Sequence, residues 1–243
     1  MGKTRHPVRR GAAGAMTPLV LIPGMMCDAR MWGGIPAALA PRSVHHALPV
    51  QGESVADMAA AILSDAPEHF ALAGLSMGGI IAMEIVRQAP DRVERLALLD
   101  TNALAEAPDV KARRAPQIDR AISGGLDNVI RDEMKASYLA NPHDTATLDL
   151  CMDMARALGQ DVFRRQSLAL RDRPDQSDTL ARFTGPALVL MGEHDRPCPR
   201  HRHEHMHRLM PQSRFVVVPD AGHLPPLEQP SATITALKEW LDQ

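Results

Sequence analysis

Aromatic residues, cysteines and long apolar runs are all scarce in this chain of 243 residues. Phe, Trp and Tyr make up 3% of the sequence, and the 45% apolar fraction comes mainly from Ala, Leu, Val and Met. Cys27, Cys151 and Cys198 are odd in number and widely spaced, which argues against a disulfide framework and favours free thiols in a reducing compartment, the cytoplasm. Since no run of about 18 apolar residues occurs, we expect no membrane span.

Neither sign of charge dominates the sequence. There are 27 basic and 29 acidic residues, with a formal net charge of −2. The field of the whole protein should therefore neither attract nucleic acid nor hold the chain to an anionic membrane. A small, near-neutral substrate fits this balance better, and we expect no cofactor.

The N-terminus is basic but lacks the other features of an export signal. Lys3, Arg5, Arg9 and Arg10 are not followed by an apolar stretch of about 7–15 residues before Pro18. We therefore expect a disordered tail over residues 1–16. The remaining residues, 17–243, are near the upper size of one hydrophobic core and predict a single domain.

Short apolar runs alternate with helical patterns along most of the chain. Runs typical of buried strands cover residues 18–22, 43–48, 70–75, 93–99, 187–191 and 215–218. Helical patterns cover residues 29–39, 54–66, 80–88, 199–210 and 231–241, with Ser54 and Ser231 as expected N-caps. This alternation predicts an α/β protein with a mostly parallel sheet flanked by helices on both faces.

The regular alternation stops at residue 101 and resumes at Pro186. The segment between them, 101–185, contains helical patterns at Leu126–Tyr138 and Thr147–Leu158. No repeat or low-complexity linker sets it apart. We therefore expect a helical lid that covers the sheet rather than an independent domain.

Ser76 stands in the pattern Gly74-Leu75-Ser76-Met77-Gly78, between an expected strand and an expected helix. This context is typical of a nucleophile elbow, in which a serine lies on a sharp and strained turn. Residues without bulky side chains let the strand and the helix approach closely. Ser76 is therefore our candidate nucleophile.

A serine nucleophile needs a histidine base and a carboxylate that orients the base. His223 follows the last expected strand, and Asp195 follows the strand before it. The order Ser, Asp, His is that of α/β-hydrolases. Asp100 is the main alternative acid because it also ends a strand at the same edge, and Glu193 and Asp220 are weaker alternatives.

Two other patterns bear on the chemistry. His201, His203, His205 and His207 alternate along an expected helix, where side chains two residues apart point about 200° apart and do not converge on one metal ion. We expect these four to lie on a solvated helix, with no metal site. For an oxyanion hole, the candidates are the backbone N–H of Met77, which follows the nucleophile, and that of Met25, in the Pro-Gly turn after the first strand.

These segments together resemble the α/β-hydrolase superfamily, and within it small bacterial esterases that include pimeloyl-carrier methyl esterases and proline-iminopeptidase-like enzymes. The resemblance rests on Gly-Leu-Ser-Met-Gly-Gly at residues 74–79, Leu-Leu-Asp-Thr at 98–101, Gly-Glu-His-Asp at 192–195 and Gly-His-Leu at 222–224, and spans about residues 17–242. It departs from the usual pattern in having Pro23 where many relatives have histidine, and in starting at what resembles the third strand. The resemblance therefore implies about six strands rather than eight.

The interpretation that fits best is a serine hydrolase that cleaves a small carboxylic ester through an acyl-serine intermediate. Met25, Met26, Met134 and Met154 are candidate apolar liners of its pocket. A thioesterase, an amidase or a carbon–carbon hydrolase would use the same residues. A weakly catalytic ligand receptor with the same fold is the alternative of another class.

Overall fold

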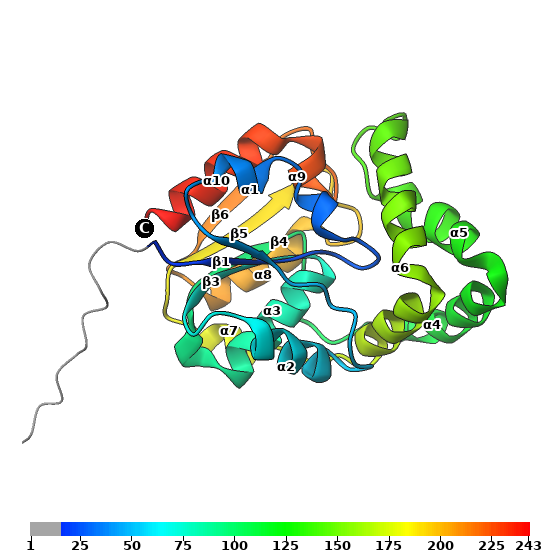
Figure 1. Cartoon of the computed structure of the whole chain (residues 1–243), viewed down its shortest axis with the longest axis horizontal. Helices are drawn as coiled ribbons and strands as arrows, with labels where there is room; N and C mark the ends of the chain where they lie inside the picture. The colour runs from blue at the N-terminus through cyan, green and yellow to red at the C-terminus, as the bar shows by residue number, and fades with distance from the viewer. Residues whose placement is uncertain (1–15) are drawn as a thin grey trace, which may run out of the picture.

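The structure, a computed structural model, describes residues 16–243, and these form one central sheet between two layers of helices (Figure 1). The tail expected at residues 1–16 therefore lies outside the described residues, apart from Met16, which is exposed. No helix in the described part of the chain is both long enough and apolar enough to cross a bilayer.

All six strands of the sheet run parallel, in the order β2-β1-β3-β4-β5-β6. Their bounds are β1 Leu19–Ile22, β2 Val44–His46, β3 Phe70–Leu75, β4 Val93–Leu99, β5 Ala187–Gly192 and β6 Arg214–Val218. Every residue of β1, β3 and β5 is buried, as expected for parallel strands covered on both faces. The chain moves from β1 outward to β2 and then returns to β3 on the other side. Ligands of such sheets bind at the carboxyl ends of the strands beside this switch point.

Helices cover both faces of the sheet, as the sequence predicts. On one face lie α1 (Ile35–Ala38), α9 (Pro225–Glu228) and α10 (Pro230–Leu241), and on the other α2 (Val55–Asp65), α3 (Met77–Gln88), α7 (Ser177–Arg182) and α8 (Arg200–Leu209) (Figure 1). Ser54 caps α2 as expected, because its side chain accepts a hydrogen bond from the backbone N–H of Asp57 at 3.0 Å.

Two local expectations were wrong. The helix expected over residues 29–39 is a short 3₁₀ helix at Ala29–Trp32 followed by the single turn of α1. Gly33 separates them with a φ of 50°, a conformation that suits glycine and ends a helix. The last helix begins at Pro230, one residue before the expected cap Ser231, because proline is well placed in a first helical turn.

The segment 101–185 contributes a group of helices beside the carboxyl ends of the strands, on the right in Figure 1. They are α4 (Pro108–Arg120), α5 (Leu126–Asn128) and α6 (Thr145–Arg171), with π-helical turns at Ala121–Gly125 and Val129–Met134 and a 3₁₀ turn at Lys135–Ser137. Gly159, with a φ of 78°, breaks α6 into two parts. The last helix of the segment, α7, packs against α3 and α8 instead.

Candidate active site

Ser76 lies on a strained turn between β3 and α3. Its φ of 54° and ψ of −116° belong to a region that residues with side chains rarely adopt. Two hydrogen bonds hold this geometry: Ser76 N–H donates to the carbonyl of Leu99 at 2.9 Å, and the Thr101 hydroxyl donates to the carbonyl of Ser76 at 2.7 Å. The backbone of Ser76 is therefore held at the carboxyl edge of the sheet by Leu99, the last residue of β4, and by Thr101, which follows that strand.

The turn requires glycine on both sides of Ser76. A Cβ added at Gly74 would lie 2.2 Å from the carbonyl oxygen of Gly78, and one at Gly78 would lie 2.1 Å from the carbonyl oxygen of Ile22. Because both obstacles are backbone atoms, neither can move aside as a flexible side chain could. Helix α3 thus approaches strands β3 and β1 at distances that only glycine allows.

The Gly74→Ala substitution is therefore expected to destabilise the protein by about 3 kcal/mol, through overpacking of the backbone. Unfolding in urea, followed by circular dichroism, measures this change. Gly34→Ala is the matched control, because its added Cβ would meet no atom within 4 Å and its φ is an ordinary −81°. A Gly74→Ala protein as stable as Gly34→Ala would contradict the close packing of β3 and α3.

His223 stands between Ser76 and Asp195 in one line of hydrogen bonds. The distance from His223 Nε2 to Ser76 Oγ is 2.9 Å, and that from His223 Nδ1 to Asp195 Oδ1 is 2.8 Å. Asp195 follows β5 and His223 follows β6, so adjacent parallel strands deliver the two side chains to the same edge as Ser76. Both side chains are almost fully buried, and Asp195 Oδ1 also accepts a hydrogen bond from Cys198 N–H at 2.9 Å.

None of the alternative acids hydrogen-bonds to His223 in the described residues. Glu193 and Asp220 are exposed, and Asp100 instead accepts a hydrogen bond from Gly192 N–H at 2.8 Å. Asp100 is completely buried beside Asp195, and this burial, together with the charge of Asp195, holds the pKa of Asp100 well above its usual range. The raised pKa favours the protonated form of Asp100, whose carboxyl group lies close to that of Asp195. Oδ2 of Asp100 and Oδ2 of Asp195 are both buried without a hydrogen-bond partner in the described residues.

The sequence did not single out two residues that hold the histidine loop. Tyr138 accepts a hydrogen bond from His223 N–H through its carbonyl at 2.6 Å, and its ring lies edge-on to the imidazole with the centroids 4.7 Å apart. The carboxylate of Glu228 accepts from the N–H groups of Gly222 and Leu224, each at 2.9 Å, and from Ala140 N–H at 2.7 Å. The position of Glu228, shortly after the loop residue His223, is a sequence signal that could have identified it, whereas no local pattern of residues marks Tyr138.

The two amides expected at an oxyanion hole flank the serine. Met25 and Met77 both line the cavity that contains Ser76. In the part of the chain that the structure describes, neither backbone N–H donates a hydrogen bond to another residue. Both amides are thus available to an oxygen atom bound next to Ser76.

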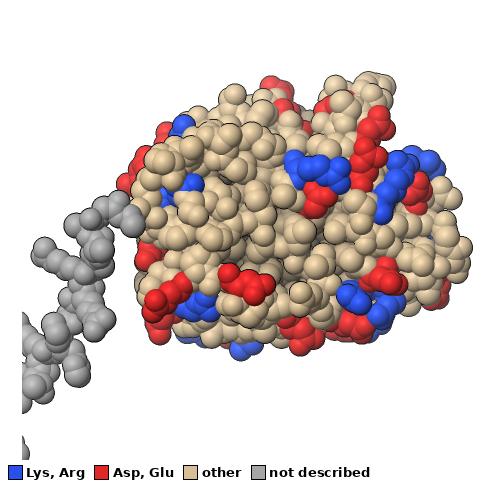
Figure 2. All heavy atoms as spheres, in the orientation of Figure 1, with Lys and Arg blue, Asp and Glu red and all other residues tan. Residues whose placement is uncertain are grey.

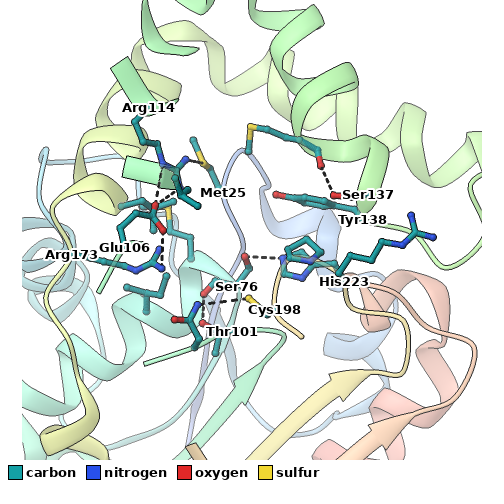
Figure 3. A pocket seen from close by; sticks show the side chains of 18 of the residues that line it. Met25, Ser76, Thr101, Glu106, Arg114, Ser137, Tyr138, Arg173, Cys198 and His223 are labelled. Carbon is teal, nitrogen blue, oxygen red and sulfur yellow. Dashed lines mark hydrogen bonds and ion pairs between the residues drawn. The ribbon is translucent and has the colours of Figure 1, made fainter. Parts of the chain in front are cut away.

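The cavity beside Ser76 and His223 has a volume of about 460 Å³, which suits a small molecule. Of the four methionines expected in its lining, Met25 and Met134 are there, whereas Met26 and Met154 are buried in the core. Figure 3 shows that Arg114 and Arg173 lie on one side of the cavity with Glu106 between them, while Tyr138 and His223 lie on the other. The lining is thus more polar than the expected methionines suggested.

The histidine run on α8 faces several directions rather than one. His203 is completely buried, His205 hydrogen-bonds to Ser177 at 3.2 Å, and His207 hydrogen-bonds to Ser213 at 2.7 Å. The helix is therefore less solvated than expected. Burial lowers the pKa of His203 to about 4, which leaves this imidazole neutral at physiological pH.

Comparisons with known proteins agree with this architecture. Residues 19–236 match the model of the alpha/beta hydrolase family. The chain is 28% identical to a pimeloyl-[acyl-carrier protein] methyl ester esterase of Pectobacterium atrosepticum, over 89% of this chain and 91% of the relative. The solved structure of a thermophilic esterase from Thermogutta terrifontis, with malate bound, superposes with a TM-score of 0.85 at 30% identity, over 94% of this chain and 90% of that one.

A more distant structure shows the fold alone. The enol-lactonase from Burkholderia xenovorans LB400 superposes with a TM-score of 0.82 at 21% identity, over 96% of this chain and 94% of that one. The match of the family model over most of the chain, together with the six parallel strands and the serine turn after β3, leads to one conclusion. The chain belongs to the alpha/beta hydrolase family.

Proposed function

We propose that the protein hydrolyses small carboxylic esters through an acyl-serine intermediate. The observation that carries this proposal is the line of hydrogen bonds from Ser76 through His223 to Asp195, at the edge of a cavity. The relatives support an ester as the substrate, since one is named as a methyl ester esterase and another as an esterase.

In the proposed mechanism His223 carries its proton on Nδ1, where it donates to Asp195. Nε2 then accepts the hydroxyl proton of Ser76 as Oγ attacks the ester carbonyl. The imidazolium returns this proton to the leaving alcohol, and an acyl-serine remains. Water, activated by His223 in the same way, attacks the acyl group and releases the acid and free Ser76. The carboxylate of Asp195 stabilises the imidazolium in both steps.

The negative charge that forms on the carbonyl oxygen needs hydrogen-bond donors that are already in place. We assign this role to the backbone N–H groups of Met25 and Met77, because both line the cavity at Ser76 and neither has another acceptor in the described residues. Met25 follows β1 and Met77 follows β3, the two strands at the switch point of the sheet.

We also propose that helices α4 to α6, with the turns between them, act as a lid. Arg114 of α4, Tyr138 and the α6 residue Leu170 all line the cavity. Tyr138 also contacts His223 directly, so this segment supports the site as well as covering it.

A substrate panel tests the ester preference. The turnover of 4-nitrophenyl esters of increasing acyl length is compared with that of matched thioesters and 4-nitroanilides. We expect esters to be hydrolysed with the highest kcat/KM, because an alcohol is the leaving group that the proposal assigns. Faster turnover of the thioester or the anilide would overturn the assignment and would point to a thioesterase or an amidase.

Labelling of the protein tests the nucleophile independently of the substrate. A fluorophosphonate probe is expected to modify one residue, and mass spectrometry of the digested protein should place the adduct on Ser76. An unlabelled protein, or an adduct on another residue, would contradict the proposal.

A further inference from the structure

The cavity at Ser76 has a surplus of positive charge that the rest of the molecule does not share. Five arginines line it, against two glutamates, Glu106 and Glu133. Figure 2 shows basic and acidic side chains interspersed over one face of the molecule, in keeping with the net charge of −2. The surplus is therefore local to the cavity, and the balance of the whole chain does not predict it.

Three of these arginines are partly or fully withdrawn from solvent, and two of them share one carboxylate. Glu106, whose side chain is 5% exposed, pairs with Arg114 at 2.7 Å and with Arg173 at 2.9 Å (Figure 3). The third, Arg202 on α8, is half-buried, and in residues 16–243 its side chain has neither an ion pair nor a hydrogen bond. We call Arg114, Arg173 and Arg202 the arginine wall.

The charges of the arginine wall act on one another. Burial lowers the pKa of Arg173, and the positive charges of Arg114 and Arg202 lower it further, against the opposing charge of Glu106. The second glutamate of the cavity does not help, because Glu133 pairs with Arg120 outside the lining at 2.7 Å. An anion placed in the cavity would relieve this repulsion.

We propose that the substrate of this protein carries an ionised carboxylate in addition to its ester group. The arginine wall binds this carboxylate while Ser76 attacks the ester group. A guanidinium matches a carboxylate with two parallel hydrogen bonds, and such bonds are among the strongest in proteins. Arg202 is the residue best placed to make them, because its N–H donors have no partner in the described chain. This inference rests on the proposed ester hydrolysis, and it replaces the near-neutral substrate that the overall charge suggested.

The test compares esters that differ only in this charge. Monomethyl adipate is paired with neutral methyl hexanoate to place the carboxylate on the acyl side. 3-Carboxyphenyl butyrate is paired with phenyl butyrate to place it on the alcohol side. We expect the wild type to prefer the anionic member of one pair in kcat/KM, by about tenfold or more, and the preference to weaken as salt is added.

Arg202→Gln should reduce that preference by about tenfold. The matched control is Arg208→Gln, an exposed arginine of the same helix that does not line the cavity, and it should keep the wild-type ratio. Equal turnover within both wild-type pairs, or an unchanged ratio in Arg202→Gln, would overturn the inference while leaving ester hydrolysis intact. If no ester in either pair is cleaved and the fluorophosphonate does not react, the proposed function itself fails.

Discussion

The Ser76→Ala protein is expected to lose about 10⁶-fold in kcat for a 4-nitrophenyl ester, the size of effect that removal of the nucleophile has in a serine protease. Alanine has no atom that can form the acyl intermediate, and His223 Nε2 loses the hydroxyl that lies 2.9 Å away. Steady-state hydrolysis at saturating ester measures the loss. Fluorophosphonate labelling of the same sample should disappear with it.

The substitution itself should leave the fold in place. The backbone of Ser76 is held by its N–H and carbonyl, which alanine retains, and Ser→Ala adds no atom to the tight turn. Ser231→Ala, at an exposed serine in α10, is the matched control and should keep wild-type turnover. Substantial hydrolysis by a pure, folded Ser76→Ala protein would show that the reaction does not pass through this serine.

Much of the fold could be predicted because its strands are buried on both faces. Strands β3 and β4 begin and end where their apolar runs do, at Phe70–Leu75 and Val93–Leu99. At residues 29–39, where one helix was expected, the structure has two short turns instead. There Gly33 decided the outcome through its backbone conformation, which helical periodicity does not report.

The candidate site likewise has a part that could be predicted from the sequence and a part that could not. Ser76, Asp195 and His223 each follow a strand, and parallel strands place their carboxyl ends together, so their meeting follows from chain order and topology. The contacts of Tyr138 with His223, and of Arg173 with Glu106, join segments that are far apart in the sequence. They depend on how the segment 101–185 folds over the sheet, which no local pattern of residues determines.

The second large effect is expected from Asp195→Asn, which should lower kcat for an ester by about 10⁴-fold, as loss of the orienting carboxylate does in a serine protease. An amide at this position can still contact His223 Nδ1, but it neither selects the productive tautomer nor stabilises the imidazolium with a negative charge. Activity at equal folded concentration, confirmed by circular dichroism, measures the effect. A loss of less than tenfold would remove Asp195 from the proposed mechanism.

Asp100 gives the sharpest comparison, because its carboxyl group lies close to that of Asp195 and its burial raises its pKa well above the usual range. An asparagine at residue 100 reproduces the protonated acid: its amide N–H can donate to Asp195, and its oxygen can still accept from Gly192 N–H. Asp100→Asn should therefore keep kcat within about tenfold of wild type. Asp100→Leu, of similar size, should lose more, since it leaves the buried Gly192 N–H without its acceptor.

The order of these variants separates two roles for Asp100. If Asp100 acts as a neutral hydrogen-bond donor that holds Asp195 against His223, activity should be highest in Asp100→Asn, lower in Asp100→Leu and lowest in Asp195→Asn. If Asp100 is instead the charged partner of the histidine, Asp100→Asn should be as damaging as Asp195→Asn. The geometry of the site favours the first order, because His223 Nδ1 is 2.8 Å from Asp195 while Asp100 accepts a hydrogen bond from the backbone of β5. Equal losses in the two asparagine variants would therefore reverse the assignment of the two acids.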